Sequence, residues 1–172
     1  TAKANGSIIS FDPNIRMFLW QDEDMLRKML HYGLSNCTVL KMSKDEAIYQ
    51  SGICDPEAAM ESILKNYPNI SVAFLTLGEK GSMVFSGESK AYVDAMSQKN
   101  VVDTTGAGDA FYGVCLYYIA KCSISDLTMD KLAFIAERAN AAGSIVTGRY
   151  GSMRVMPDNI EIEETVRIQR KS

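Results

Sequence analysis

The sequence predicts an α/β protein in which helices cover both faces of a mostly parallel sheet. Three short apolar segments typical of buried strands, at residues 7–11, 37–41 and 72–77, alternate with segments whose apolar residues have helical spacing. Strands separated by helices pair in parallel, and a parallel sheet is buried on both faces. Of the 172 residues, 47% are apolar and 23% are charged, which is typical of a globular protein with a core. We therefore interpret residues 1–172 as a single domain.

The first half of the chain is predicted to contain these three strands and three helices. An Asp-Pro-Asn turn ends the strand at 7–11. The helix that follows covers 22–34, with Gly33 near its end. After the strand at 37–41 come a short helix that opens at 43–46 and another that begins with an Asp-Pro-Glu sequence.

The second half has a different pattern. Three short strands separated by glycine and polar residues, at 82–85, 91–93 and 100–102, are more typical of antiparallel pairs. Apolar residues at helical spacing then predict three helices. These helices cover 107–121, 129–147 and 157–169.

Charge and cysteine usage exclude several classes of protein. The formal net charge of −3 argues against a broad nucleic-acid-binding surface. The longest apolar run, at 114–120, is far shorter than the roughly 20 residues of a membrane span, and no N-terminal signal segment is visible. Four cysteines without C-x-x-C spacing and a single histidine are typical of a reduced protein without a structural zinc site. We expect a cytoplasmic protein whose partners are neither nucleic acids nor membranes.

The most informative segment is Val-Val-Asp-Thr-Thr-Gly-Ala-Gly-Asp-Ala-Phe at 101–111. An apolar strand ends there and a helix begins at once, which leaves backbone N–H groups without partners at the positive end of a helix dipole. Gly106 and Gly108 allow an anion to approach the backbone because no Cβ is in the way. The junction therefore predicts a phosphate-binding loop. It is neither a P-loop, which needs Gly-Lys-Ser/Thr, nor a dinucleotide fingerprint, which needs Gly or Ala where Phe111 stands.

Asp109 has both a structural and a chemical interpretation. A carboxylate in the first turn of a helix stabilises it through the helix dipole by roughly 0.3–1 kcal/mol. Beside bound phosphates, however, a carboxylate repels the ligand unless it has a task. The natural task is to accept a proton from a hydroxyl that attacks the terminal phosphoryl group. Ser43 and Glu46 also have both a structural and a chemical interpretation, because their S-x-x-E spacing is that of an ordinary capping box.

The segment at 103–111 resembles the signature of the ribokinase-like (pfkB) carbohydrate kinases. Further resemblances follow the family's order from about residue 2 to residue 157. They are Ser-Phe-Asp-Pro-Asn-Ile-Arg at 10–16 with Leu-Trp at 19–20, Lys-Met-Ser-Lys-Asp-Glu at 41–46, Thr-Leu-Gly-Glu-Lys-Gly at 76–81, and Ala-Asn-Ala-Ala-Gly at 139–143. The resemblance implies a three-layer α/β/α sandwich, of which this chain carries the C-terminal, nucleotide-binding part. The N-terminal part and the lid of that fold are expected to be absent from it.

The resemblance also implies roles for individual residues. Asp109 is the catalytic base and contacts the substrate, while Arg16 approaches the phosphates or the substrate. The backbone groups implied in an anion hole belong to Gly106, Ala107, Gly108 and Asp109. The residues implied in ATP binding are Ser43, Thr76, Gly78, Lys80, Gly81, Gly108 and Asn140.

Metal ions are implied at two places. Glu46 acts through water on Mg²⁺, which bridges ATP phosphates and keeps several waters of its own. In family members that bind K⁺, the positions of Asp103 and Thr105 hold that ion near the anion hole. Two departures are visible, since Ser43 stands where many members have Asn, and residues 146–152 match the family's V-T-x-x-G-A stretch only loosely.

The function implied by the resemblance is ATP-dependent phosphorylation of a sugar hydroxyl. Fructose is the first choice of sugar, and 2-keto-3-deoxygluconate kinase and ribokinase are the alternatives. A kinase-derived regulatory protein that binds nucleotide or sugar without turnover is the non-enzymatic alternative, whereas Phe111 disfavours a NAD-binding domain. We expect a homodimer for the full-length protein. For the chain alone we expect weak nucleotide binding and inefficient phosphorylation, because catalysis needs both reactants held in place.

Overall fold

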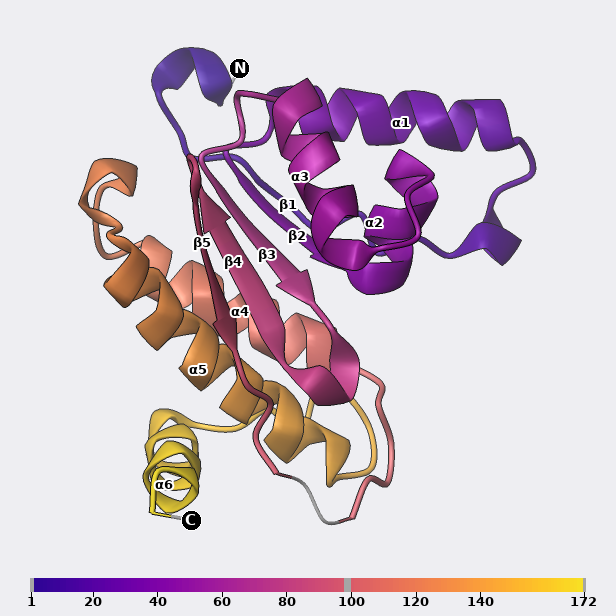
Figure 1. Ribbon diagram of the computed structural model, residues 1–172. Helices are drawn as coiled ribbons and strands as arrows, with labels where there is room; N and C mark the ends of the chain where they lie inside the picture. Colours follow the sequence, from indigo (N-terminus) through magenta and orange to yellow (C-terminus); the bar gives the residue numbers. More distant parts are fainter. Residues whose placement is uncertain (1, 98–99, 172) are drawn as a thin grey trace. The chain divides into compact units, whose positions relative to one another are not determined.

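The computed structural model describes residues 2–97 and 100–171. Its strands form a five-stranded sheet in the order β1-β2-β3-β4-β5, with flanking helices (Figure 1). Strands β1 (Ser10–Phe11), β2 (Val39–Ser43) and β3 (Val72–Thr76) pair in parallel. The predicted α/β fold with a mostly parallel sheet is therefore confirmed.

Strands β4 and β5 follow β3 without an α-helix between them. The 3-10 helix η3 (Gly78–Lys80) connects β3 to β4 (Ser82–Ser86), and residues 87–88 connect β4 to β5 (Ser89–Val93). Connections this short join antiparallel strands, because a parallel pair needs a long crossover. The change of pattern predicted for the second half of the chain begins at these strands.

The chain divides into two compact units. The first consists of the residues up to Thr76 together with Phe85–Glu88, and the second of Leu77–Val84 together with the residues from Ser89 onward. Each α-helix of the first unit begins at a side-chain oxygen, since Asp22, Ser43 and Asp55 accept hydrogen bonds from first-turn backbone N–H groups. These helices are α1 (Glu23–Asn36), α2 (Lys44–Ser51) and α3 (Pro56–Asn66).

Gly33 lies near the end of α1, as predicted, but the helix continues past the predicted Leu34 to Asn36. A Cβ at Gly33 would overlap the ring of Phe11. A glycine at this position therefore lets the Phe11 ring at the end of β1 pack directly on the helix. Its role is close packing within the first unit rather than helix termination.

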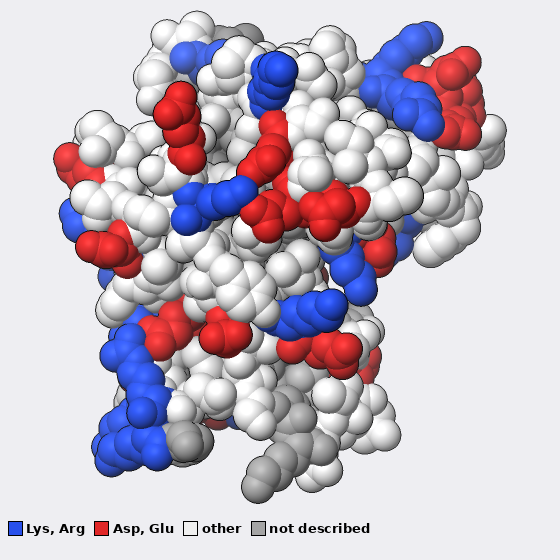
Figure 2. Space-filling view, viewed as in Figure 1, with Lys and Arg blue, Asp and Glu red and all other residues white. Residues whose placement is uncertain are grey.

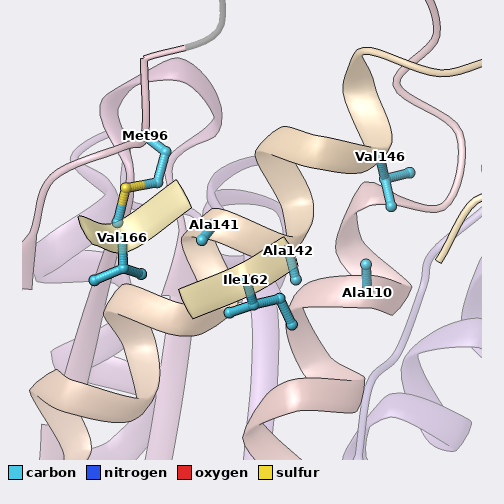
Figure 3. Packing of buried hydrophobic residues seen from close by; sticks show 7 residues of the cluster. All are labelled: Met96, Ala110, Ala141, Ala142, Val146, Ile162 and Val166. Atoms are coloured by element: carbon cyan, nitrogen blue, oxygen red, sulfur yellow. The ribbon is translucent and has the colours of Figure 1, made fainter. Parts of the chain in front are cut away.

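The core of the second unit lies among its three α-helices and the segment that follows β5. α4 (Ala107–Ile119) packs on α5 (Met129–Thr147), and α5 packs on α6 (Asn159–Gln169). Figure 3 shows the buried residues of this core, which are Met96, Ala110, Ala141, Ala142, Val146, Ile162 and Val166. Three of them are alanines, and such small side chains allow close approach of helix backbones.

The predicted strand at 100–102 does not form. The backbone N–H groups of Val102 and Asp103 both donate to the carbonyl oxygen of Thr147, at 2.8 and 3.2 Å, so they bind the end of a helix instead of a neighbouring strand. The first strand is also shorter than the predicted 7–11. The remaining short helices are η1 (Lys3–Asn5), η2 (Met17–Leu19) and η4 (Ile124–Asp126).

Across residues 2–97 and 100–171, the structure contains no helix with the length and apolar character needed to cross a membrane.

Candidate active site

In the second unit, a closed loop leads into α4. Asp103 closes this loop, because one of its carboxylate oxygens accepts a hydrogen bond from the N–H of Thr105 at 2.9 Å and the other from the N–H of Gly151 at 3.4 Å. The bond from the Thr105 backbone is the largest cause that holds the pKa of the Asp103 carboxyl below its usual value. A charged Asp103 thus ties the loop before α4 to the loop after α5.

Gly106 forms the turn between this loop and α4. Its φ is +82°, in the left-handed region that favours glycine, and a Cβ would lie 2.9 Å from the Cβ of Ser152. A Cβ at Gly143 would lie 3.3 Å from the carbonyl oxygen of Ala107, so α5 passes close to the first residue of α4. Packing around the start of this helix is therefore close at both glycines, and at Gly106 the positive φ also favours glycine.

The first turn of α4 collects the residues predicted to form the anion hole. The carbonyl oxygen of Gly106 accepts the first helical hydrogen bond, from the N–H of Ala110 at 2.9 Å. Gly108 and Asp109 lie in the first turn, where backbone N–H groups have no helical acceptor and carry the positive end of the dipole. The side chain of Asp109 is exposed. One helical turn therefore presents both anion donors and a carboxylate to solvent.

The segment that connects β3 to β4 is a tight turn. The N–H of Leu77 donates to the carbonyl oxygen of Gly81 at 2.8 Å, and the Tyr92 hydroxyl donates to the carbonyl oxygen of Lys80. Gly81 has a φ of +99°, and a Cβ there would overlap the carbonyl oxygen of Val93. This glycine therefore permits contact between the start of β4 and the end of β5. Lys80 itself is exposed.

Asn140 holds the backbone that follows β5. Its side chain is buried, and its amide nitrogen donates to the carbonyl oxygens of Val93 and Asp94, both at 3.0 Å. Because a side-chain amide has two N–H donors, both are used within the protein, and only its oxygen remains for a ligand. The predicted contact with ATP therefore has to be made by that oxygen or by neighbouring atoms.

A cavity of about 610 Å³ lies on α5 beside the end of β5. Its walls come from residues 92–96, from Asp130, Ala133, Phe134 and Glu137 on α5, and from Gln169 and Arg170. None of the residues predicted to bind ATP lines it. The cavity is thus separate from the first turn of α4.

In the first unit, the predicted residues gather where the parallel strands end. Ser43 and Thr76 are register partners at the ends of β2 and β3, and Asp12 directly follows β1. Ligands of open parallel sheets bind outside the carboxyl ends of the strands. The sequence-predicted pair of Ser43 and Thr76 therefore lies at the edge where a ligand is expected.

Glu46 makes more than a capping box. One carboxylate oxygen accepts from the N–H of Ser43 at 2.8 Å, which completes the capping box of α2 with the bond from the N–H of Glu46 to the Ser43 hydroxyl. The other oxygen accepts from the N–H of Ile15, also at 2.8 Å. Both oxygens of this buried carboxylate are thus bound to backbone, so it suits an indirect contact with a metal ion better than a direct one.

Within the described ranges, no three His, Cys, Asp or Glu residues gather closely enough to hold a metal ion.

Asp12 and Lys41 form an ion pair that the sequence analysis did not single out. The Lys41 ammonium lies 3.1 and 3.3 Å from the two carboxylate oxygens of Asp12, and both side chains are largely buried. Burial raises the pKa of the Asp12 carboxyl, and Lys41 offsets part of this rise. A lysine at the end of an apolar strand-like segment was the available signal, because lysine is almost never buried without a partner.

Arg16, by contrast, is exposed. Its guanidinium donates to the carbonyl oxygen of Ile15 at 3.3 Å. On the face of the molecule shown in Figure 2, acidic and basic side chains are interspersed rather than gathered by sign.

A family model described as pfkB family carbohydrate kinase matches residues 1–159. The chain belongs to this family. The match includes the loop and first turn of α4, and it also includes the residues at the carboxyl ends of β1, β2 and β3. The predicted family resemblance is therefore confirmed.

Individual pfkB relatives include named fructokinases. The Arabidopsis thaliana protein named "Probable fructokinase-7" is 34% identical over 170 residues, which are 95% of this chain and 48% of that protein. The fructokinase of Vibrio cholerae O395, in its form with fructose, ADP and calcium ion bound, is 27% identical with a TM-score of 0.87. That match covers 96% of this chain and 52% of the other. A fructokinase from Xylella fastidiosa with bound ATP is 25% identical with a TM-score of 0.86, over 98% of this chain and 54% of the other.

The chain thus spans about half the length of these relatives. Their likeness extends over nearly all of this chain and confirms the ribokinase-like α/β fold.

Proposed function

We propose that the protein to which this chain belongs is an ATP-dependent sugar kinase that phosphorylates fructose. One observation carries the proposal, namely that an exposed carboxylate, Asp109, lies in the same helical turn as the unpaired N–H groups of Gly108 and Asp109. Phosphoryl transfer needs mainly positioning and stabilisation of negative charge, together with a base for the attacking hydroxyl. Relatives named fructokinase and the fructose-bound and ADP-bound Vibrio structure support the choice of sugar.

In the proposed reaction, Asp109 accepts the proton of the attacking sugar hydroxyl. The sugar oxygen then forms a bond to the γ-phosphorus of ATP, the bond from that phosphorus to the bridging oxygen breaks, and ADP leaves. Backbone N–H groups at Gly106, Gly108 and Asp109 stabilise the charge on the transferred group. The N–H of Ala107, which the family resemblance also implies in the anion hole, donates to the carbonyl oxygen of Thr104 at 3.3 Å and would have to release that oxygen to take part. The exposed side of the turn suits this role because the donors and the base reach the same ligand.

The nucleotide is proposed to contact several short segments of the chain. Ser43 and Thr76 lie at the carboxyl edge of the parallel strands, and the positive φ of Gly78 and Gly81 lets phosphates approach the turn before β4. Lys80 and Arg16 are exposed cations suited to phosphate oxygens, and Arg16 alternatively reaches the sugar substrate. The side-chain amide oxygen of Asn140 is the atom of that residue that remains free to contact the adenine of ATP.

Metal ions have two proposed positions. Mg²⁺, held through water by Glu46, neutralises phosphate charge when bound. The Vibrio fructokinase carries a calcium ion together with ADP, which supports a divalent ion. Oxygen atoms of Asp103 and Thr105 are proposed to hold K⁺, and a double mutant of the same Vibrio enzyme is described with potassium ion bound.

The test is ADP release by the full-length protein with fructose, 2-keto-3-deoxygluconate, ribose and adenosine as separate substrates. We expect turnover with fructose, and Asp109→Asn should lower kcat by about a hundredfold or more because the base is lost. The matched control is Asp130→Asn, an exposed carboxylate in the first turn of α5. Both substitutions remove a favourable helix-dipole interaction, but only the first removes the base.

The outcomes separate the alternatives. Unchanged turnover in Asp109→Asn would remove that residue as the base. Turnover with another sugar but not with fructose would show that the proposed substrate is wrong while the proposed phosphoryl transfer is right. ATP binding without turnover of any sugar would favour the non-enzymatic alternative.

A further inference from the structure

The turn that follows β1 is held in an unfavourable conformation. Among the residues that the structure describes, Asn14 is the single non-glycine with positive φ, at +43°. Asparagine adopts this region more readily than most residues, but a residue there still costs of order 1 kcal/mol and persists only where its surroundings enforce it. Something around the turn must therefore hold it.

Two carboxylates, one partly buried and one buried, hold this turn from its two ends. At its start, Asp12 accepts from the N–H of Asn14 at 3.3 Å and from the Lys41 ammonium. At its end, Glu46 accepts from the N–H of Ile15 at 2.8 Å. Lys41 and Glu46 are only 6% and 8% exposed, so both holding groups lie inside the first unit rather than on its surface.

Stability of the fold alone does not call for a lysine in β2. Its strand neighbours Leu40 and Met42 are fully buried, and an apolar side chain at the same position would avoid the cost of burying two charges. Replacing buried ion pairs by apolar residues is often neutral or stabilising. The ion pair is better explained by the geometry that it imposes on the turn.

The residue that this geometry presents is Arg16. It directly follows the fixed Ile15, its guanidinium also contacts the Ile15 carbonyl oxygen, and within the described part of the chain no carboxylate pairs with it. An exposed guanidinium beyond the carboxyl end of a parallel strand is suited to bidentate binding of phosphate oxygens. Fixing its backbone reduces the entropy lost when it binds.

We propose that Lys41 and Asp12 are positioning residues, which together with Glu46 lock the turn at 12–15 and so aim Arg16 at the phosphates of ATP. This inference rests on the proposed function. It adds that Lys41 acts through Arg16 and not by contact with the nucleotide.

The test is a double-mutant cycle on the full-length protein with Lys41→Met and Arg16→Ala, read as KM and kcat for ATP and as the Kd of ATP from calorimetry. Arg16→Ala should raise the KM for ATP about tenfold, which corresponds to about 1.4 kcal/mol. Lys41→Met should raise it several-fold in the wild-type background. In the Arg16→Ala background, Lys41→Met should change it less than about twofold, because the group that it aims is gone.

Two further variants control for folding. Lys41→Met leaves the partly buried Asp12 carboxylate without its cation. The double variant Lys41→Met/Asp12→Asn should therefore unfold at a higher temperature than Lys41→Met while its KM stays raised. Lys65→Met, an exposed lysine in the last turn of α3, should leave KM unchanged.

The result decides between positioning and packing. If Lys41→Met raises the KM and the Kd equally in both backgrounds, Lys41 acts independently of Arg16 and the inference is wrong. If the double variant Lys41→Met/Asp12→Asn restores the wild-type KM, the ion pair is only structural. If the wild-type protein binds ATP but turns over no sugar, the Kd cycle still decides the inference while the proposed reaction fails. If it binds no ATP, both fail.

Discussion

Burial and a neighbouring charge act in opposite directions on the Asp12 carboxyl. Burial is the largest single cause and raises its pKa, whereas the Lys41 ammonium at 3.1 Å lowers it. The Glu46 carboxylate also raises it, and the net shift is upward. A carboxyl whose pKa is raised by folding binds its proton more tightly in the folded state. Its contribution to stability is therefore complete below the unfolded pKa of about 3.9 and is lost as the pH rises through the folded pKa.

Asp12→Asn should reveal this linkage. The variant has no proton to release at this position, whereas the unpaired Lys41 costs it the same free energy throughout the acidic range. The difference in free energy of unfolding between wild type and variant should thus shift against the wild type as the pH rises above about 4. Urea unfolding at several pH values measures it, and a difference that moves in the opposite direction would show that Lys41 outweighs burial.

Gly106, which has a left-handed backbone conformation directly before α4, leads to a second prediction about a single residue. Gly106→Ala should lower the free energy of unfolding by at least about 1 kcal/mol, because alanine is unfavourable at φ +82° and its Cβ would press on Ser152. It should also lower kinase activity, since the new methyl group lies at the proposed anion hole.

The control lies in the same helix. Gly113 is exposed in the middle of α4 and a Cβ there meets nothing within 4 Å, so Gly113→Ala should raise stability by about 0.5–1 kcal/mol. Urea unfolding distinguishes the two variants, and equal stabilities would contradict the assigned backbone conformation.

At the scale of elements, α6 is fixed to α5 by one apolar row and by ion pairs. Ile162 and Val166 are buried in the core of the second unit, while Arg138 on α5 donates to both carboxylate oxygens of Glu163 at 2.6 and 2.8 Å. Glu163 is half exposed, so solvent weakens this pair. Apolar burial is therefore the main contribution that holds α6 in place.

Two isoleucines on α6 test whether apolar burial holds this helix in place. Ile162→Ala should lower the free energy of unfolding by about 2–4 kcal/mol, because it removes buried apolar volume. Ile160→Ala removes the same atoms from a side chain that is 70% exposed and should change it by less than about 0.5 kcal/mol. Chemical denaturation of both variants gives the comparison, and similar losses would mean that α6 docks through another face.

At the scale of the whole molecule, the relatives that support the proposed reaction are about twice as long as this chain. Residues 1–172 contain the proposed base and anion hole, but phosphoryl transfer also needs the sugar held in line with the γ-phosphate. We therefore expect the isolated chain to bind ATP weakly and, with fructose as the substrate, to release ADP from ATP at least about a hundredfold more slowly than the full-length protein. Parallel assays of the two proteins measure this ratio, and comparable turnover would show that the chain itself completes the sugar site.

Local patterns in the sequence were enough to predict much of this molecule. The caps at Ser43 and Asp55, the α5 boundaries at Met129–Thr147 and the glycine-rich junction at 106–109 depend on residues close together in the chain, and short-range physics decides them. The family resemblance rested on these same local segments. It extended the prediction to roles that spacing alone left open, such as that of Asp109.

Other features depend on partners that are distant in sequence. The carbonyl oxygen of Thr147 accepts hydrogen bonds from the N–H groups of Val102 and Asp103, so the predicted strand at 100–102 does not form. Gly33 lies near the end of α1 as predicted, but its close contact with the ring of Phe11 could not be seen in the sequence. The ion pair between Asp12 and Lys41 joins the residue that follows β1 to a residue in the middle of β2. No local pattern specifies such contacts, because a buried charge or an unpaired N–H takes whichever partner the packed chain brings within hydrogen-bond distance.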